Sequence, residues 1–534
     1  MAYVIDSSRC VGCGACAYEC LFGVPQAVDD EKSKFHIDRE KCIGCGQCMA
    51  ICPNDAIVPD ATQRKIRKVT IDQEKCIGCS MCSRVCKVAA PHGEMKSPFE
   101  IDRKKCFRCG LCASKCPKQA IDVEYEEPEK VKGGFSMYKI YCKIFQAVMK
   151  VANYFLGYRM PEYIEGPGSI KKLPQMLKDK GAGKVLVVTD NGLMKLGLPD
   201  GLLNALKEEG VEYALYSDVE PNPTSDNVEA GYKIYKENNC EAIVAMGGGS
   251  PMDCAKGIGA KAAHPNKSVA QLQGILKVHK KIPLFFAVPT TAGTGSETTV
   301  AAVITDSATH HKASINDPAI LPKYAVLDPE LTVGLPPFIT STTGMDALAH
   351  AVEAYTNHKY NTPLENDLAR QAVRLIYDNL LKAYHDGSDM EARQNMQKAA
   401  FFAGRAFTRG CVGYVHAVGH TLGGLYGVAH GKAMSILLPH VMREFGSAAH
   451  KRLAELADVC GMDGKNDAEK AEKFIRWIED MKREMEIPEY VDMIKDEDVE
   501  QIIKWAMAEA NPLYPTPVLW QHDDFARFLA KVRG

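Results

Sequence analysis

The feature that most constrains this chain is a cysteine spacing that occurs four times before residue 117. Each unit begins with Ile-Asp and continues as CxxCxxCxxxC, and the units start 30 to 34 residues apart. Three thiolates this close together can ligate three irons of one [4Fe–4S] cluster, while the fourth reaches a neighbouring cluster. This internal repeat predicts short strands ending in Ile-Asp, each followed by a loop around a cluster.

Cysteine usage and charge indicate the setting in which the chain works. Of its 21 cysteines, 16 belong to the repeat, which favours metal clusters in a reducing cytoplasm over disulfides. A net charge of −2 gives no sign of nucleic-acid binding. The first residues lack the apolar run of a signal peptide. We therefore expect a cytoplasmic protein with no nucleic-acid partner and no transmembrane segment.

A linker is expected at 126–157. Its first part is charged and ends in two glycines, and its second part places apolar residues at helical spacing. These residues are Met137, Ile140, Tyr141, Ile144, Phe145, Val148, Ala152 and Phe155. Lysines interrupt the segment, so it is not expected to span a bilayer. Two interpretations remain: the helix docks one domain onto another, or it lies on a membrane surface.

From residue 158 the pattern alternates between strands and helices, which is typical of an α/β domain with a parallel sheet. Buried strands are predicted at 184–190, 212–219, 241–249 and 283–291. The turn GGGSPMD (247–253) suits a phosphate, because glycines let the backbone approach and a helix N-terminus attracts anions. Ser250 is expected to cap that helix.

Two further features support a nucleotide site. A second Gly/Thr loop, PTTAGTGSE (289–297), follows another predicted strand. Asp190 stands at a strand end, where a carboxylate accepts hydrogen bonds from ribose hydroxyls and repels a 2′-phosphate. This favours NAD over NADP.

The helical part after residue 337 carries spaced nitrogen and oxygen ligands. Asp346 and His350 lie one helical turn apart, as do His416 and His420, and His430 follows before a glycine. These five side chains are more ligands than one divalent metal site requires, and none of them is a thiolate. That ligand set suits Fe(II), Zn or Mn.

The cysteine repeat resembles the bacterial ferredoxin module of two [4Fe–4S] clusters, present twice. The resemblance implies four clusters. Their ligand sets would be Cys10, Cys13, Cys16 and Cys52; Cys42, Cys45, Cys48 and Cys20; Cys76, Cys79, Cys82 and Cys116; and Cys106, Cys109, Cys112 and Cys86. Zinc is the alternative, although tetrahedral zinc favours two separated CxxC pairs.

The stretch 158–534 resembles the iron-containing (group III) alcohol dehydrogenases. The matching motifs are GGGSPMDCAK, PTTAGTGSE, TTGMDALAHAVEAY and the H-x3-H-x9-H of residues 416, 420 and 430. The resemblance implies the metal ligands Asp346, His350, His416 and His430. It makes His420, as a proton relay near the nicotinamide, and Asp253 the candidate catalytic residues. The implied cofactor-binding residues are Asp190, Asn222, Gly248, Gly249, Ser250, Asp253, Thr290, Thr291, Thr294 and Lys312.

The expected architecture is multidomain. It comprises α+β ferredoxin-like cluster modules at 1–125, the linker with its amphipathic helix at 126–157, an α/β NAD-binding domain with a parallel sheet at 158–336, and an all-α metal-binding catalytic domain at 337–534.

The expected function is that of an NAD(H)-dependent Fe(II) alcohol dehydrogenase or aldehyde reductase acting on a small alcohol or aldehyde. We expect a homo-oligomer whose four clusters exchange single electrons with a flavoenzyme or a ferredoxin-linked partner. One alternative is an electron-transfer or docking subunit in which the ferredoxin part is the main function. Others are a glycerol-type or dehydroquinate-synthase-like enzyme of the same fold, and clusters that are only structural.

Overall fold

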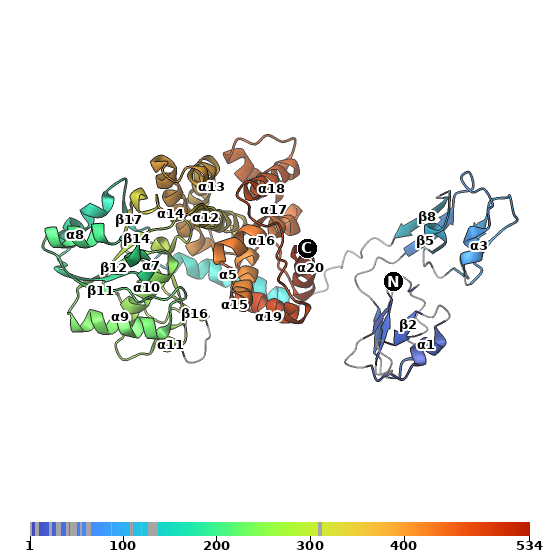
Figure 1. The fold of residues 1–534 in the computed structure, drawn as a ribbon, viewed down its shortest axis with the longest axis horizontal. Coiled ribbons are helices and arrows are strands. Elements are labelled where there is room, and N and C mark those ends of the chain that lie inside the picture. The colour runs from blue at the N-terminus through green and yellow to red at the C-terminus, as the bar shows by residue number, and fades with distance from the viewer. Residues whose placement is uncertain are drawn as a thin grey trace. The chain divides into compact units, whose positions relative to one another are not determined.

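The computed structural model describes residues 3–5, 10–20, 24–27, 34–38, 42, 48, 51–53, 56–59, 66–86, 88–106, 108, 111–118, 120–125, 137–307 and 312–533. The chain forms two compact units, Met1–Ser136 and Met137–Gly534 (Figure 1). Each unit is described by itself.

The first unit contains two-stranded antiparallel sheets and short helices. The pairs are β1 (Tyr3–Ile5) with β4 (Ile57–Pro59), β2 (Pro25–Ala27) with β3 (Phe35–Ile37), β5 (Ile66–Ile71) with β8 (Ile121–Tyr125), and β6 (Pro91–His92) with β7 (Glu100–Ile101). The helices α1 (Ala15–Glu19), α3 (Met81–Val85) and α4 (Leu111–Ser114) each begin inside a cysteine motif. The sequence repeat is therefore also a structural repeat, in which the β1–β4 and β5–β8 pairs each join the two ends of a pair of motifs.

The cores of the first unit are small and include cysteines. One joins Val24, Ile37 and Ile57 with Cys16 and Cys48. The other joins Val69, Phe99 and Ile121 with Cys82 and Cys112. Because so short a segment buries little apolar surface, its stability is expected to depend on what the cysteines bind.

The second unit contains a six-stranded sheet whose neighbouring strands are all parallel. Its order is β11 (Glu212–Tyr216), β10 (Lys184–Val188), β12 (Ala242–Gly247), β14 (Leu284–Pro289), β17 (Tyr324–Leu327) and β9 (Glu162–Glu165). The four predicted strands are confirmed, whereas β9 and β17, of four residues each, were not predicted. The chain order reverses between β10 and β12, which is where such sheets bind ligands.

Helices cover both faces of this sheet, which explains why its strands are almost wholly apolar. Alternate residues of β10, β12 and β14 belong to two separate cores. One core is closed by α9 (Ser225–Glu237) and α10 (Gly249–Ala263), the other by α6 (Leu173–Asp179) and α8 (Asp200–Glu208). The shorter elements here are α7 (Asn191–Lys195), α11 (Val269–Leu272), β13 (Gly274–Ile275), β15 (Ala301–Thr305) and β16 (Lys312–Asn316).

The rest of the second unit is helical and gathers on one side of the sheet (Figure 1). Its helices are α12 (Pro337–Asn357), α13 (Pro363–His385), α14 (Met390–Gly410), α15 (Tyr414–Tyr426), α16 (His430–Phe445), α17 (Ser447–Val459), α18 (Asp467–Glu484), α19 (Val499–Ala510) and α20 (His522–Val532). Helix α12 is almost wholly buried and packs against α13, α14 and α16. Within the described ranges, no helix has both the length and the apolarity to cross a membrane.

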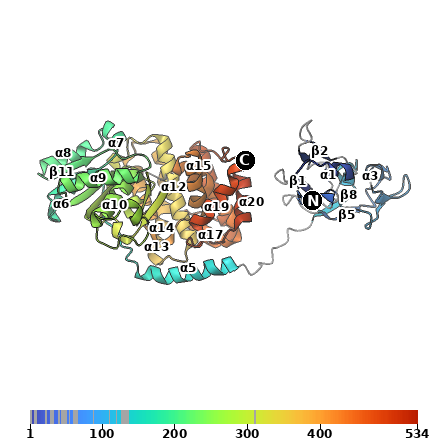
Figure 2. The same ribbon diagram turned by 90° about the horizontal axis from the view of Figure 1, so that it is seen from below.

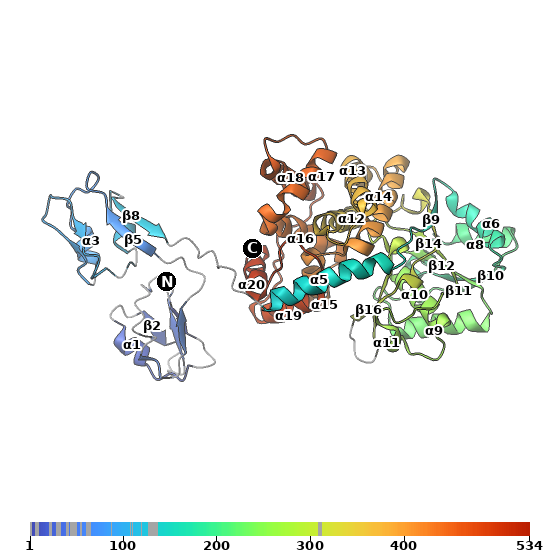
Figure 3. The ribbon, with the colours of Figure 1, turned by 180° about the vertical axis from the view of Figure 1, so that it is seen from behind.

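Helix α5 (Met137–Phe155) opens the second unit and packs on its helical side (Figure 3). The side chains that face the protein are Cys142, Gln146 and Asn153. Gln146 Nε2 donates to the carbonyls of Pro512 and Tyr514, at 3.2 and 3.0 Å. Most of the apolar side chains that the sequence selected are exposed, and within this unit buried hydrogen bonds orient the helix. The expected docking of one domain onto the other stays a prediction.

Candidate active site

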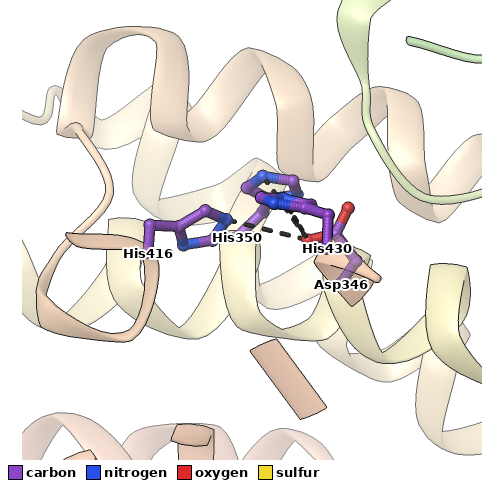
Figure 4. A group of neighbouring side chains, drawn as sticks. All are labelled: Asp346, His350, His416 and His430. Carbon is purple, nitrogen blue, oxygen red and sulfur yellow. Dashed lines mark ion pairs between the residues drawn. The ribbon is translucent and has the colours of Figure 1, made fainter. Parts of the chain in front are cut away.

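Four side chains of the helical part converge on one point (Figure 4). Asp346, His350, His416 and His430 each offer a ligand atom, and these atoms all lie within 4.8 Å of one another. Asp346 Oδ1 is 3.9 Å from His350 Nε2, 3.7 Å from His416 Nε2 and 3.3 Å from His430 Nε2. The sequence placed these residues on three separate segments, and the fold brings them together from α12, α15 and the start of α16.

The donor set fits a divalent metal. Asp346 Oδ1 and His416 Nε2 are buried and have no hydrogen-bond partner. Buried polar atoms without partners are costly, whereas carboxylate and imidazole donors suit Fe(II), Zn or Mn. The side chain of His430 is 43% exposed, so the point remains accessible from one side.

The protonation states of these side chains reflect their burial and their mutual contacts. Burial raises the pKa of Asp346, but the three histidines outweigh it and hold that pKa well below its usual range. Burial lowers the pKa of His350 to about 3. Burial also opposes the proton on His416, but Glu353 and Asp346 outweigh it and raise the His416 pKa to about 9. A metal would therefore displace a proton from His416 when it binds.

Glu353 orients His416 and was not predicted as a site residue. Its Oε2 lies 2.5 Å from His416 Nδ1, and its Oε1 accepts from the backbone N–H of Val415 at 2.8 Å. A carboxylate can only accept, so Nδ1 carries the proton and Nε2 faces the other ligands. Glu353 lies one helical turn after His350 in the AVEAY segment. This spacing in the sequence could have identified it as a site residue.

We expect Glu353→Gln to weaken metal binding about 10- to 100-fold. The neutral amide fixes the orientation of the His416 ring less firmly and makes its Nε2 less basic. Metal titration of the full chain would measure the change. Glu455→Gln is a matched control, since Glu455 bonds to Tyr355 rather than to a histidine. Equal affinities of the wild type and Glu353→Gln would contradict this role.

His420 lies beside the metal ligands without belonging to the converging set. Its ring stacks on that of His430, with centroids 5.2 Å apart. Glu509 Oε1 lies 2.8 Å from His420 Nδ1 and also accepts from the hydroxyl of Tyr514. Burial raises the pKa of Glu509, but His420 and Tyr514 outweigh it and hold it below its usual value. Because a carboxylate only accepts, Nδ1 carries a proton in this contact, and the role of His420 as a proton relay stays a prediction. No signal in the sequence linked Glu509 to His420.

The glycine-rich turn 247–253, which the sequence predicts to bind a phosphate, lies where the strand order reverses. Gly247 ends β12 with φ +153°, and a Cβ there would lie 2.5 Å from Pro251 Cγ, so only glycine fits. Gly248 precedes the first turn of α10. Ser250 does not cap α10 as expected: it lies inside the helix, and its Oγ donates to the carbonyl of Pro221 at 2.5 Å. That the amides at the start of α10 bind an anion stays a prediction.

Asp190 and the other predicted cofactor residues surround this turn. Asp190 follows β10 and caps α7 by accepting from the backbone N–H of Leu193 at 3.0 Å. Lys312 Nζ donates to Asn222 Oδ1 at 2.6 Å, so these two predicted residues lie together. Thr290, Thr291 and Thr294 follow β14, next in the sheet to β12.

Asp253 and Lys256 form a buried network beneath the turn. Asp253 accepts from Ser296 Oγ at 3.0 Å and from the N–H of Val303 at 3.0 Å. Lys256 Nζ donates to Ser296 Oγ, Thr299 Oγ1 and the carbonyl of Ala301. Both Asp253 oxygens are therefore occupied within the protein, and its catalytic role stays a prediction. Lys256, in the quoted GGGSPMDCAK motif, was missed.

The loop 289–297 joins the sheet to the helices. Gln397 of α14 donates to the carbonyl of Pro289, and Thr408 donates to the carbonyl of Thr298. Gly295 has φ +59°, and a Cβ there would lie 2.6 Å from the Cα of Gly404. The backbone of this loop is thus in direct contact with the backbone of α14.

In the first unit, Cys10, Cys13, Cys16 and Cys52 line one cavity, together with Ile5 and Ile57. A second cavity is lined by Cys76, Cys79, Cys82 and Cys116. Backbone N–H groups donate to sulfurs in both sets, for example Ala56 to Cys52 and Ala120 to Cys116, each at 3.3 Å. These are two of the four predicted ligand sets. The other two include Cys45 and Cys109, which lie outside the described residues.

A parallel sheet with a glycine-rich turn, joined to an Asp/His₃ site, is typical of a class of metal-dependent dehydrogenases, here preceded by cysteine-lined modules. The chain belongs to the iron-containing alcohol dehydrogenase family: the family model for iron-containing alcohol dehydrogenases matches residues 161–329, and its C-terminal model matches 340–532. Models of the 4Fe-4S dicluster domain match 3–59 and 41–90, and a 4Fe-4S binding domain matches 99–122. The enzyme is thus fused to ferredoxin-like domains.

Individual relatives agree with this assignment. The NAD-dependent methanol dehydrogenase of Bacillus methanolicus is 39% identical over 374 residues, which cover 68% of this chain and 97% of that protein. The 1,3-propanediol dehydrogenase of Klebsiella pneumoniae is 40% identical, over 67% of this chain and 95% of that protein. A solved 1,3-propanediol oxidoreductase superposes with a TM-score of 0.68 at 37% identity, over 71% of this chain and 99% of that one.

Proposed function

We propose that the second unit is an NAD(H)-dependent, Fe(II)-containing alcohol dehydrogenase or aldehyde reductase for a small alcohol or aldehyde. One observation carries the proposal: four donor atoms of Asp346, His350, His416 and His430 lie within 4.8 Å of one another. They belong to the same compact unit as the phosphate-binding turn.

The residues around the donors have distinct roles in this proposal. A divalent metal held there would polarise the substrate oxygen, while a nicotinamide cofactor carries the hydride. His420, whose Nδ1 is held by Glu509, moves a proton between its Nε2 and the substrate side of the site. The turn at Gly248 and the start of α10 bind the pyrophosphate. Asp190 accepts from the ribose hydroxyls.

The proposal is tested by aldehyde reduction with the full-length, iron-loaded protein under anaerobic conditions, with NADH and NADPH compared. We expect NADH to be preferred, because Asp190 repels a 2′-phosphate. Asp190→Gly should raise the relative use of NADPH at least several-fold. Glycine is the suitable replacement, because it retains all but a few tenths of a kcal/mol of the helix cap.

Asp218→Gly is the control, since Asp218 lies two residues beyond the end of the neighbouring strand β11 and its Oδ1 accepts from Asn191 Nδ2 at 2.9 Å. A wild-type enzyme that already prefers NADPH would refute the role of Asp190. Inability to reduce any small aldehyde or oxidise any small alcohol would refute the proposed function itself.

We further infer that the first unit exchanges single electrons with a separate flavoenzyme or ferredoxin-linked partner. Among the cysteines that line the two described cavities, Cys13 and Cys79 are exposed, so these edges are open to a partner. Each cluster takes one electron, whereas NADH gives up a hydride, and a flavin normally converts one into the other.

With NADH alone, the flavin-free protein should therefore leave its cluster absorbance unchanged over many turnovers of aldehyde reduction. Addition of a reduced ferredoxin or a flavoenzyme with NADH should bleach the clusters. Rapid bleaching by NADH alone would show that the partner is not required, and that the two units form one internal circuit.

A further inference from the structure

Helix α5 presents an uncharged apolar stripe to the outside of the second unit. The stripe consists of Met137, Tyr141, Ile144, Val148, Val151 and Phe155, whose side chains are 53–86% exposed. In Figure 2 the helix runs along the edge of the unit, and no other described element of that unit lies outside it. Surface helices usually turn such a stripe towards the protein.

Polar contacts hold the stripe in this orientation. On the opposite side of α5, Lys359 Nζ donates to Gln146 Oε1 at 2.9 Å, and the hydroxyl of Tyr158 donates to Asn153 at 2.8 Å. Cys142 is fully buried on the same side. The helix is therefore fixed on its support, and the stripe would stay ordered without a partner.

The spacing of the stripe is that of a coiled coil. Its members follow one another at intervals of 4, 3, 4, 3 and 4 residues, which are the a and d positions of a heptad. The positions that flank this seam are uncharged throughout: Tyr138, Ile140, Phe145, Ala147, Ala152 and Tyr154. Lys139, Lys143 and Lys150 occupy helical positions outside the stripe and its flanks.

We propose that the α5 stripe pairs with the same stripe of a second copy of this chain, in antiparallel orientation across a two-fold axis. The sequence is complementary to itself in that arrangement. Met137 then faces Phe155, Tyr141 faces Val151, and Ile144 faces Val148, so that the larger side chain of each pair meets a smaller one. A two-fold interface requires this kind of self-complementarity.

Area and charge favour a second copy over other partners. With five aromatic rings on or beside the stripe, the exposed face offers on the order of 1,000 Å², against roughly 800 Å² per partner in a standard interface. Helix α5 contains no acidic residue, and its lysines lie outside the stripe and outside the positions that flank it. The stripe itself therefore offers a partner an uncharged surface.

The test uses two double variants of the full chain, Ile144→Glu/Val148→Glu and Ile144→Lys/Val148→Lys. Light scattering should show that each has at most half the mass of the wild-type assembly. Mixing the two should restore the wild-type mass, because in the antiparallel pair each new carboxylate faces a new ammonium. Lys143→Glu, on the same helix but outside the stripe, should leave the mass unchanged.

Aldehyde reduction and helicity show whether the double variants are folded. Folded variants with the wild-type mass would overturn the proposal, as would a mixture that fails to reassemble. Flotation of the wild type with phosphatidylglycerol–phosphatidylcholine vesicles, together with an unchanged mass in the variants, would assign the stripe to a membrane surface instead. Should both variants misfold, disulfide formation between Cys residues introduced at 144 and 148 of different copies decides, and its absence also overturns the pairing.

Discussion

Replacing His350 by alanine should reduce kcat/KM for aldehyde reduction by about 10³-fold or more. His350 is buried among the converging donors, and its Nε2 lies 3.9 Å from Asp346 Oδ1. Loss of one of four ligands weakens metal binding, and a metal contributes several kcal/mol of transition-state stabilisation, where each 1.36 kcal/mol corresponds to tenfold in rate. Steady-state kinetics and metal analysis of the same sample would measure both effects.

His440→Ala is the matched control, because His440 lies on α16, away from the donors, and bonds to the carbonyl of Glu489. Its activity should stay close to that of the wild type. Cluster absorbance should survive in both variants, since the clusters belong to the other unit. Retained activity in His350→Ala would show that the assignment of the metal site is wrong. Loss of cluster absorbance alone, with activity unchanged, would show the same.

Replacing Lys256 by methionine should lower the free energy of unfolding of the second unit by about 3–5 kcal/mol. Its ammonium is fully buried and makes three hydrogen bonds, to Ser296, Thr299 and Ala301. Burial lowers the pKa of Lys256 to about 8 and raises that of the adjacent Glu297 to about 7. Methionine keeps the volume but leaves two acidic side chains without their cation.

Urea unfolding of the full chain, followed by circular dichroism, would measure the change. Lys233→Met is the control. Lys233 is exposed on α9, and its Nζ is as far as 4.0 Å from Glu237 Oε1. Its replacement should lower the free energy of unfolding by less than about 0.5 kcal/mol. Equal stabilities of the two variants would show that Lys256 does not compensate the buried acids.

The parts of the site that depend on local spacing could be predicted from the sequence. Asp346 and His350 share a helix face because they are four residues apart, and the glycine turn follows a predicted strand. The meeting of α12, α15 and α16 depends on packing over long sequence distances, so only the family resemblance anticipated it. Glu509 is 89 residues from His420, and no local pattern connects them.

Helix α5 shows where periodicity stops being informative. Its apolar spacing predicted a helix, and the helix is there. The same spacing suggested that the helix docks one domain onto the other, which stays a prediction, and within the second unit Gln146 and Asn153 make the polar contacts. Hydrophobicity indicates which face of a helix avoids water, but it does not indicate which surface covers that face. Buried polar hydrogen bonds, which no periodicity reveals, decided the orientation here.

The contact between Gly295 and Gly404 has a mechanical consequence. Two backbones in contact there leave no side chain that could yield, so the sheet and the helices keep their separation at this loop. We therefore expect any opening and closing of this unit to be a rotation about this contact rather than a sliding of one part past the other. His350, whose ring faces the backbone carbonyl of Gly293 in the same loop, sits close to that pivot. The distances between the metal ligands would stay constant during opening and closing. The residues furthest from the loop 289–297 would undergo the largest displacements.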